Sequence, residues 1–152
     1  MEEGLSLWAN PSSPHAEGRK ARSLLEDARE RIKAALGWEG ELIFTSGASE
    51  SAELALTRAK AGARCVGAVE HDAILKAAPD AERLPVRPDG ALDLDALREA
   101  VQRERPLVAV QQVNSETGNR QDLEAIAAIV REAGGLLLAD CAQGAGRFAL
   151  PP

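Results

Sequence analysis

Short apolar runs alternate with amphipathic segments along almost the whole chain of 152 residues, and this alternation restricts the possible folds more than any other feature. The runs at 64–69, 107–113 and 136–140 have the length and composition of strands. The last of them, LLLAD, is apolar at four consecutive positions, which is typical of a strand covered by helices on both faces of its sheet. Strands separated by helices favour parallel pairing. The sequence therefore predicts an α/β fold with three layers, αβα, around a mostly parallel sheet.

The predicted elements follow one another within a single partial domain that covers residues 1–152. A first helix is expected at 14–36, because Ser12 and Ser13 can cap it and Pro14 suits its first position. Residues 41–152 are expected to form successive strand–helix units. Besides the three strands above, we predict strands at 41–45 and 83–86, and helices at 48–60, at 72–77, from Asp93 onward, and around 123–130 before Gly134 and Gly135.

Composition excludes several classes of function. The chain has 18 lysines and arginines against 24 aspartates and glutamates, and this net charge of -6 argues against a nucleic-acid partner. Its apolar runs are far shorter than the roughly 18 residues that span a membrane. Cys65 and Cys141 form neither a disulfide framework nor a metal cluster, so no metal site is predicted. The N-terminus lacks the pattern of a signal peptide, and a cytoplasmic protein is expected.

Polar residues follow the predicted strands at their carboxyl ends, where ligands collect in open parallel sheets. These groups are Ser46–Ser49, Glu70 with His71, Asn114 with Ser115, and Asp140 with Gln143. We expect the turn at 46–49, His71, Asp140 and Gln143 to converge on one open pocket.

Each group also has a purely structural interpretation when it is taken alone. The glycine turn at 46–49 leads into a helix and suits a phosphate, but its serines can equally cap that helix. His71 can be an acid or base, a metal ligand, a ring that stacks on a ligand, or a hydrogen-bonded structural histidine. A metal is disfavoured, because no His or Cys stands at metal-ligand spacing from it. Asp140 either caps the following turn or meets a cationic group, and Asn114 with Ser115 can be simple turn residues.

Five motifs occur in a fixed order and together resemble one known family. They are NPSSPHAEGR (10–19), FTSGASES (44–51), VEHDAIL (69–75), VNSETG (113–118) and DCAQGAGR (140–147). In this order they are similar to the pyridoxal-phosphate-dependent cysteine desulfurases, the class V branch of the fold-type-I aminotransferases. The resemblance extends over nearly the whole chain and implies an incomplete large domain of such an enzyme.

The resemblance implies a role for each motif residue. Gly47, Ala48 and Ser49 would hold the phosphate of pyridoxal 5'-phosphate, and His71 would stack on the pyridine ring as the catalytic histidine. Asp140 would contact the ring nitrogen and Gln143 the phenolic oxygen. Asn114 and Ser115 would also contact the cofactor. Ser115 stands where the family usually has a second asparagine, and it is shorter and lacks an amide donor.

Two covalent groups of the family have no counterpart in this sequence. The family's Schiff-base lysine lies in an SxHK segment beyond the aspartate motif, and its nucleophilic cysteine lies in a C-terminal domain that is expected to be absent here. Lys20, Lys33, Lys60 and Lys76 are not in such a context. We therefore expect a chain that is truncated at both ends, inactive alone, poorly folded in isolation, and dependent on a homodimer or a complementing chain.

Three functions follow as hypotheses. The first is the cofactor-binding portion of a cysteine desulfurase, which converts L-cysteine or a related amino acid to L-alanine with enzyme-bound persulfide sulfur, as in iron-sulfur cluster assembly. The second is a non-catalytic or complementing subunit of a split pyridoxal-phosphate enzyme. The third is a generic α/β phosphate-binding protein, which gives no reason for placing His71, Asp140 and Gln143 together.

Overall fold

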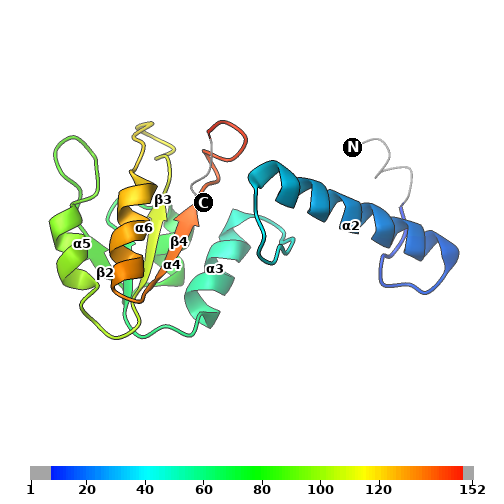
Figure 1. Cartoon of the computed structure of the whole chain (residues 1–152), viewed down its shortest axis with the longest axis horizontal. Helices are drawn as coiled ribbons and strands as arrows, with labels where there is room; N and C mark the ends of the chain where they lie inside the picture. The colour runs from blue at the N-terminus through cyan, green and yellow to red at the C-terminus, as the bar shows by residue number, and fades with distance from the viewer. Residues whose placement is uncertain (1–7, 149–152) are drawn as a thin grey trace. The chain divides into compact units, whose positions relative to one another are not determined.

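The structure is a computed structural model that describes residues 8–148. The chain divides into two compact units, the first ending at Phe44 and the second beginning at Thr45. Figure 1 shows the elements of both units. The parts of the predicted elements that fall on residues 1–7 and 149–152 lie outside the described residues.

The first unit consists mainly of the long helix α2, Ala16–Leu36 (Figure 1). The helix begins later than predicted: His15 is its N-cap, while residues 10–13 form a turn in which Ser13 N–H donates to Asn10 O. Gly37 ends the helix as predicted, in the left-handed conformation at φ 63°, and the next amide, that of Trp38, returns to Lys33 O.

The strand predicted at 41–45 is wrong. Residues 41–45 form no strand, and the side chain of Ile43 is 72% exposed. Arg29 from α2 holds this segment instead, donating to Leu42 O at 2.9 Å and lying 5.3 Å from the centre of the Phe44 ring. A β-strand exists only where a neighbour takes up its backbone hydrogen bonds, and none of the described residues does so here.

The second unit contains a four-stranded sheet in the order β2-β1-β3-β4, and all three strand pairs are parallel. The prediction of a parallel sheet is therefore confirmed. The strands are β1 Arg64–Gly67, β2 Glu82–Leu84, β3 Leu107–Gln111 and β4 Leu136–Asp140. The chain moves from β1 to β2 on one side and then crosses to β3 on the other side, so the sheet has its switch point between β1 and β3.

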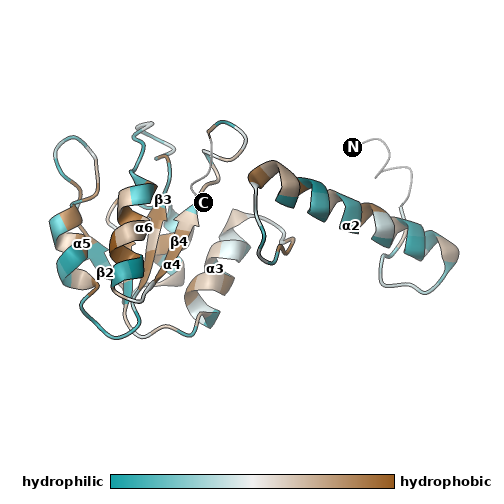
Figure 2. Cartoon of the chain, in the orientation of Figure 1, coloured by the Kyte–Doolittle hydropathy of each residue, from teal (hydrophilic) through white to brown (hydrophobic). Residues whose placement is uncertain are grey.

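Helices cover both faces of this sheet, as the predicted αβα layering requires (Figures 1 and 2). One buried cluster combines Val66, Leu107 and Ala109 with residues of α3 (Ala48–Arg58) and α4 (Asp72–Ala77). The other combines Cys65, Val108 and Val110 with residues of α5 (Leu94–Ala100) and α6 (Leu123–Glu132). Successive residues of one strand thus enter opposite cores, which explains why β3 is apolar at each of its first four positions.

Asp93 and Asp122 begin the helices of the second core by capping them. The Asp93 carboxylate accepts from the amides of Asp95 and Ala96, and the Asp122 carboxylate accepts from that of Ala125. Strand β4 forms an edge of the sheet and is only partly buried, with Leu136 50% exposed. The prediction that β4 is covered on both faces is therefore met only in part.

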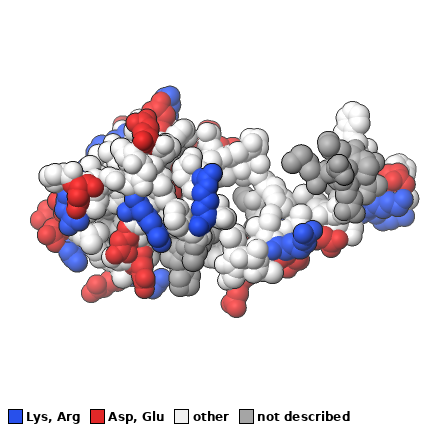
Figure 3. Space-filling view, turned by 90° about the horizontal axis from the view of Figure 1, so that it is seen from above, with Lys and Arg blue, Asp and Glu red and all other residues white. Residues whose placement is uncertain are grey.

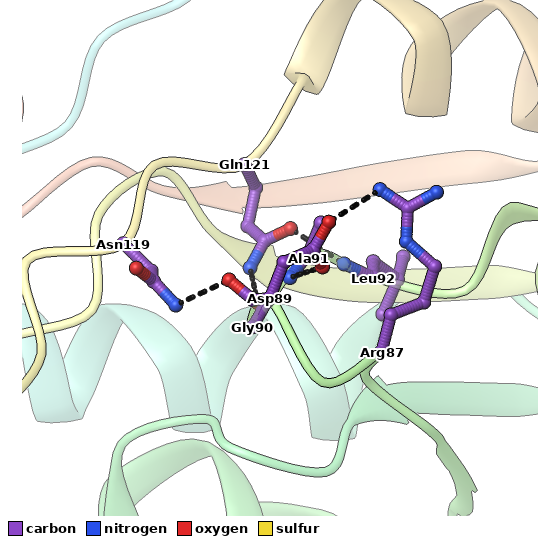
Figure 4. Close-up of polar contacts among 7 residues, drawn as sticks. All are labelled: Arg87, Asp89, Gly90, Ala91, Leu92, Asn119 and Gln121. Carbon is purple, nitrogen blue, oxygen red and sulfur yellow. Dashed lines mark hydrogen bonds and ion pairs between the residues drawn. The ribbon is translucent and has the colours of Figure 1, made fainter.

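Two loops beyond the strand ends are joined by side-chain amides (Figure 4). Gln121, which is buried, accepts from Leu92 N–H at 2.8 Å and donates to Gly90 O at 2.9 Å. Asn119 donates to Asp89 O at 3.1 Å. Gly90 has φ 81°, and a Cβ there would collide with the Asn119 amide, so the turn requires glycine for both reasons. We call these contacts the 90/121 clasp.

The described surface carries charges of both signs, interspersed on the face that Figure 3 shows. No helix in the described range 8–148 is long and apolar enough to cross a membrane. Within the same range, no group of three or more His, Cys, Asp and Glu residues is arranged to hold a metal ion.

Candidate functional site

A cavity of about 120 Å³ lies at the carboxyl edge of the sheet in the second unit. It is bordered by the start of α3 and by the segments that follow β1, β3 and β4. The sequence-predicted residues along it are Ala48, Ser49, His71, Ser115, Asp140 and Gln143. The structure therefore brings together residues from four motifs that are up to 95 positions apart (48 to 143). Gly47 and Asn114 are not among the lining residues.

The N-terminus of α3 is open toward solvent. Gly47 is its N-cap, and no side chain caps the first turn. A Cβ added at Gly47 would have no heavy atom of the described residues within 4 Å. Since the first amides of a helix have no partner within it, this end presents N–H donors and the positive end of the helix dipole.

Glu50 is the acidic residue in this first turn, and its carboxylate already accepts hydrogen bonds. Its carboxylate accepts from the backbone N–H and the hydroxyl of Ser46 at 2.6 and 2.7 Å. These two hydrogen bonds lower the pKa of Glu50. Ser46 thus serves the turn rather than the cavity, while Ser49 lines the cavity.

His71 has a structural contact and also borders the cavity. Its Nδ1 accepts from Ala73 N–H at 3.1 Å, so the ring caps α4. This hydrogen bond assigns the ring proton of the neutral form to Nε2 and fixes the direction of the ring. A structural role of His71 and a position facing a ligand are therefore compatible.

Asp140 ends β4, and one of its carboxylate oxygens is engaged. Oδ1 accepts from Ala142 N–H at 2.9 Å, which shapes the following turn. Gln143, in that turn, accepts a hydrogen bond from Arg147 through its side-chain oxygen at 3.3 Å. Asp140 caps its turn with Oδ1, while Oδ2 has no hydrogen bond to any of the residues 8–148 and can take a second partner.

Asn114 organises the loop that carries Ser115. Its side-chain oxygen accepts from the amides of Glu116 and Thr117 at 2.9 and 2.8 Å, and its amide donates to Val69 O at 3.1 Å. These contacts engage both ends of the side chain. The cofactor contact that the resemblance implies for Asn114 stays a prediction.

Two residues were given no role in the predicted site, although Glu70 was noted at a strand end. Gln111 lines the cavity and donates to Val69 O. Glu70 does not line the cavity but is buried, and burial together with the negative charge of Asp140 raises the pKa of Glu70 to about 8. A glutamine that ends an otherwise apolar strand was the signal for Gln111, and the pairing of Glu70 with His71 at a strand end was the signal for Glu70.

The two cysteines do not have the properties of reactive thiols. Burial raises the pKa of Cys65 and of Cys141, and a nearby carboxylate, Glu82 or Asp140 respectively, adds to each shift. Cys65 is buried in the core and Cys141 is partly buried. Both are small residues of the fold.

Comparison with known proteins identifies the family. The model of the family described as aminotransferase class-V matches residues 2–150. The chain belongs to the class-V aminotransferase family.

Several known proteins resemble the chain in sequence or in structure. A cysteine desulfurase of Frankia sp. (strain EuIK1) is 39% identical over an alignment covering 92% of this chain and 39% of that protein. A solved NifS-like protein from Rickettsia africae has 31% identity and a TM-score of 0.90, over 98% of this chain and 45% of that one. A structure described as SspA in complex with cysteine has 27% identity and a TM-score of 0.82, over 95% and 48%.

These comparisons confirm the predicted family and fold class. The αβα unit matches part of the fold of NifS-like enzymes, which are fold-type-I pyridoxal-phosphate enzymes. The chain spans less than half of the length of each of these relatives.

Proposed function

We propose that this class-V aminotransferase chain forms the cofactor-binding part of a pyridoxal-phosphate-dependent cysteine desulfurase. The whole enzyme would convert L-cysteine to L-alanine and retain the sulfur as a persulfide. The observation that carries the proposal is that the uncapped start of α3, His71 and Asp140 border one cavity. The cysteine desulfurases among the relatives support the reaction, and cysteine in the SspA complex supports the substrate.

The donor set fits pyridoxal phosphate group by group. The open amides of α3 and the Ser49 hydroxyl suit a phosphate, and the fixed, flat ring of His71 suits stacking on an aromatic ring. Oδ2 of Asp140 suits a protonated ring nitrogen, and Gln143 suits a phenolic oxygen. The cavity of about 120 Å³ is smaller than typical ligand pockets of roughly 300–1,000 Å³, so these residues border one part of the bound molecule.

Bound pyridoxal phosphate supplies an electron sink for bond breaking at the substrate amino acid. The residues of this chain orient it and set its charge. The Asp140 carboxylate keeps a proton on the ring nitrogen by charge pairing, while His71 limits the tilt of the ring. Ser115, at the tip of its loop, offers a hydroxyl where the family usually has an amide.

A complementing subunit of a split enzyme is the second candidate. It is favoured by the placement of the lysines, since none of those in the described residues lines the 120 Å³ cavity. Lys76, on α4, forms an exposed ion pair with Asp72 at 2.8 Å. A homodimer or a complementing chain, a cytoplasmic location and a role in iron-sulfur cluster assembly belong to the proposal.

Cofactor binding to the Asp140→Asn variant tests the proposal. The asparagine keeps an oxygen that can accept from Ala142 N–H, so the turn is preserved while the charge is lost. A hydrogen bond to a charged group contributes about 1.5–3 kcal/mol, which corresponds to a dissociation constant for pyridoxal phosphate roughly ten to a hundred times higher. Asp80→Asn, which removes an exposed carboxylate outside the cavity, is the matched control. Equal affinity of both variants, measured by absorbance titration, would contradict the proposal.

The expectation that this chain alone is inactive has its own test. With pyridoxal phosphate and L-cysteine, the chain alone should release no more sulfide than free cofactor does, because a desulfurase needs a positioned amine and an accessible thiolate. Borohydride reduction followed by peptide mass spectrometry should find no lysine modified in stoichiometric amount. A stoichiometric lysine adduct with steady alanine production would show that the chain is a complete enzyme.

A further inference from the structure

Glu70 is a buried carboxyl group with no role in the site as described so far. It lies in the turn after β1, where its N–H donates to Gly67 O, and it is only 6% exposed. Its Oε1 lies against Gly67, so close that a Cβ at that position would be 2.4 Å away. Its Oε2 is buried without a hydrogen-bond partner among the described residues. An ionised carboxylate in such a place is unfavourable unless something compensates it.

Gln111 connects Glu70 to the cavity. The backbone of Gln111 lies close enough to the Glu70 carboxyl to lower its pKa, in opposition to burial, and Gln111 lines the cavity. In the sheet register Gln111 pairs with Asp140, which borders the same cavity. Glu70 and Asp140 therefore flank the end of β3 from its two sides, one buried and one facing the cavity.

Asp140 on β4 is the charged group that acts on Glu70. Gly67 on β1 and Gln111 on β3, which also contact Glu70, are uncharged, and His71, next in the chain, turns to cap α4. Burial is the main reason that the pKa of Glu70 is raised to about 8, and the Asp140 charge adds to the shift. Below that pH Glu70 is a neutral acid, which leaves Asp140 as the negative charge at this edge.

We propose that Glu70 is a positioning residue of the cavity that holds its proton more tightly while Asp140 is unpaired than when the Asp140 charge is compensated. The neutral acid avoids a second anion beside Asp140. Once a cation lies against Asp140, the Asp140 charge no longer opposes ionisation of Glu70, while burial still does. Near pH 8 a larger fraction of Glu70 then loses its proton to water or buffer.

The part of this inference that concerns ligand binding rests on the proposed function. The first experiment does not depend on that function, because it uses no ligand. The chain labelled with ¹³C at glutamate carboxyls is titrated by NMR without any ligand, as wild type and as Asp140→Asn. We expect the Glu70 resonance, assigned by its loss in Glu70→Gln, to titrate at lower pH in Asp140→Asn than in wild type. Identical titration in the two proteins would overturn the inference.

The second experiment adds pyridoxal phosphate as the probe. Calorimetry in two buffers of different ionisation enthalpy gives the number of protons exchanged on binding. We expect wild type to release more protons than Glu70→Gln near pH 8, and the difference to vanish near pH 6, where the bound state too keeps Glu70 mostly protonated. Equal proton exchange by two variants that both bind would overturn the inference. Failure of pyridoxal phosphate to bind would overturn the proposed function instead, and the ligand-free titration would then decide the inference.

Discussion

Replacing Gln121 with methionine should destabilise the second unit through the loss of the 90/121 clasp. Methionine has a similar length, so the change removes hydrogen bonds with little change in volume. The Leu92 N–H loses its acceptor in a buried place, and an unsatisfied buried donor costs about 1–3 kcal/mol. The Gly90 carbonyl loses one donor, which costs about 0.5–1.5 kcal/mol. The free energy of unfolding should therefore fall by roughly 2–4 kcal/mol.

Urea unfolding followed by far-UV circular dichroism measures this change. Tryptophan fluorescence is unsuitable, since Trp8 and Trp38 both belong to the first unit. Gln102→Met is the matched control, because Gln102 is exposed and makes a single hydrogen bond to Arg98 O, and its replacement should cost less than about 0.5 kcal/mol. Hydrogen exchange at the Leu92 amide should accelerate in Gln121→Met alone. If Gln121→Met and Gln102→Met unfold at the same urea concentration, the 90/121 clasp does not stabilise the second unit and the reasoning is refuted.

Three further predictions concern groups whose environment is unusual. The free energy of unfolding should decrease as the pH rises from about 5 to 9, because the pKa of Glu70 is about 8 in the folded protein against an ordinary value of 4.5. Urea titrations of Glu70→Gln should show a weaker dependence on pH. Gly67→Ala should cost about 1–3 kcal/mol through its collision with Glu70, and a double-mutant cycle with Glu70→Ala should recover most of that cost. At pH 7 iodoacetamide should modify Cys141 more slowly than free cysteine and Cys65 more slowly still, and equal labelling by mass spectrometry would refute this order.

Segments with a strong local pattern were predicted well. Strand 136–140 and helix 72–77 have the predicted bounds, because a four-residue apolar run and a helix between two turns are defined by their own residues. The Asp93 cap was predicted for the same reason, since an N-cap depends on contacts within three positions. Other elements end earlier than predicted, as β1 does at Gly67 and α3 at Arg58.

Features that depend on distant partners were predicted poorly. Residues 41–45 have strand composition, but composition does not supply the neighbouring strand. One local feature was also missed: the helix predicted from Pro14 begins at Ala16, because Asn10 and Ser13 close a turn first.

The candidate site likewise has some features that the sequence predicts and others that it does not. The position of Asp140 and His71 beside one cavity follows from the rule that parallel strands end at one edge. The burial of Glu70 does not follow from any local pattern, because it depends on the space that Gly67 leaves and on the backbone of Gln111.

The loop that carries Ser115 is held at both of its ends, and this has a consequence for how the position can change in evolution. Asn114 ties the start of the loop to Val69, and Asn119 ties its end to Asp89. Ser115 itself is exposed and takes no part in either attachment. Substitutions at 115 therefore alter the chemistry of the cavity wall at almost no cost in stability. A member of this family can exchange asparagine for serine there, or serine for another side chain, in a single mutational step that selection for folding does not oppose.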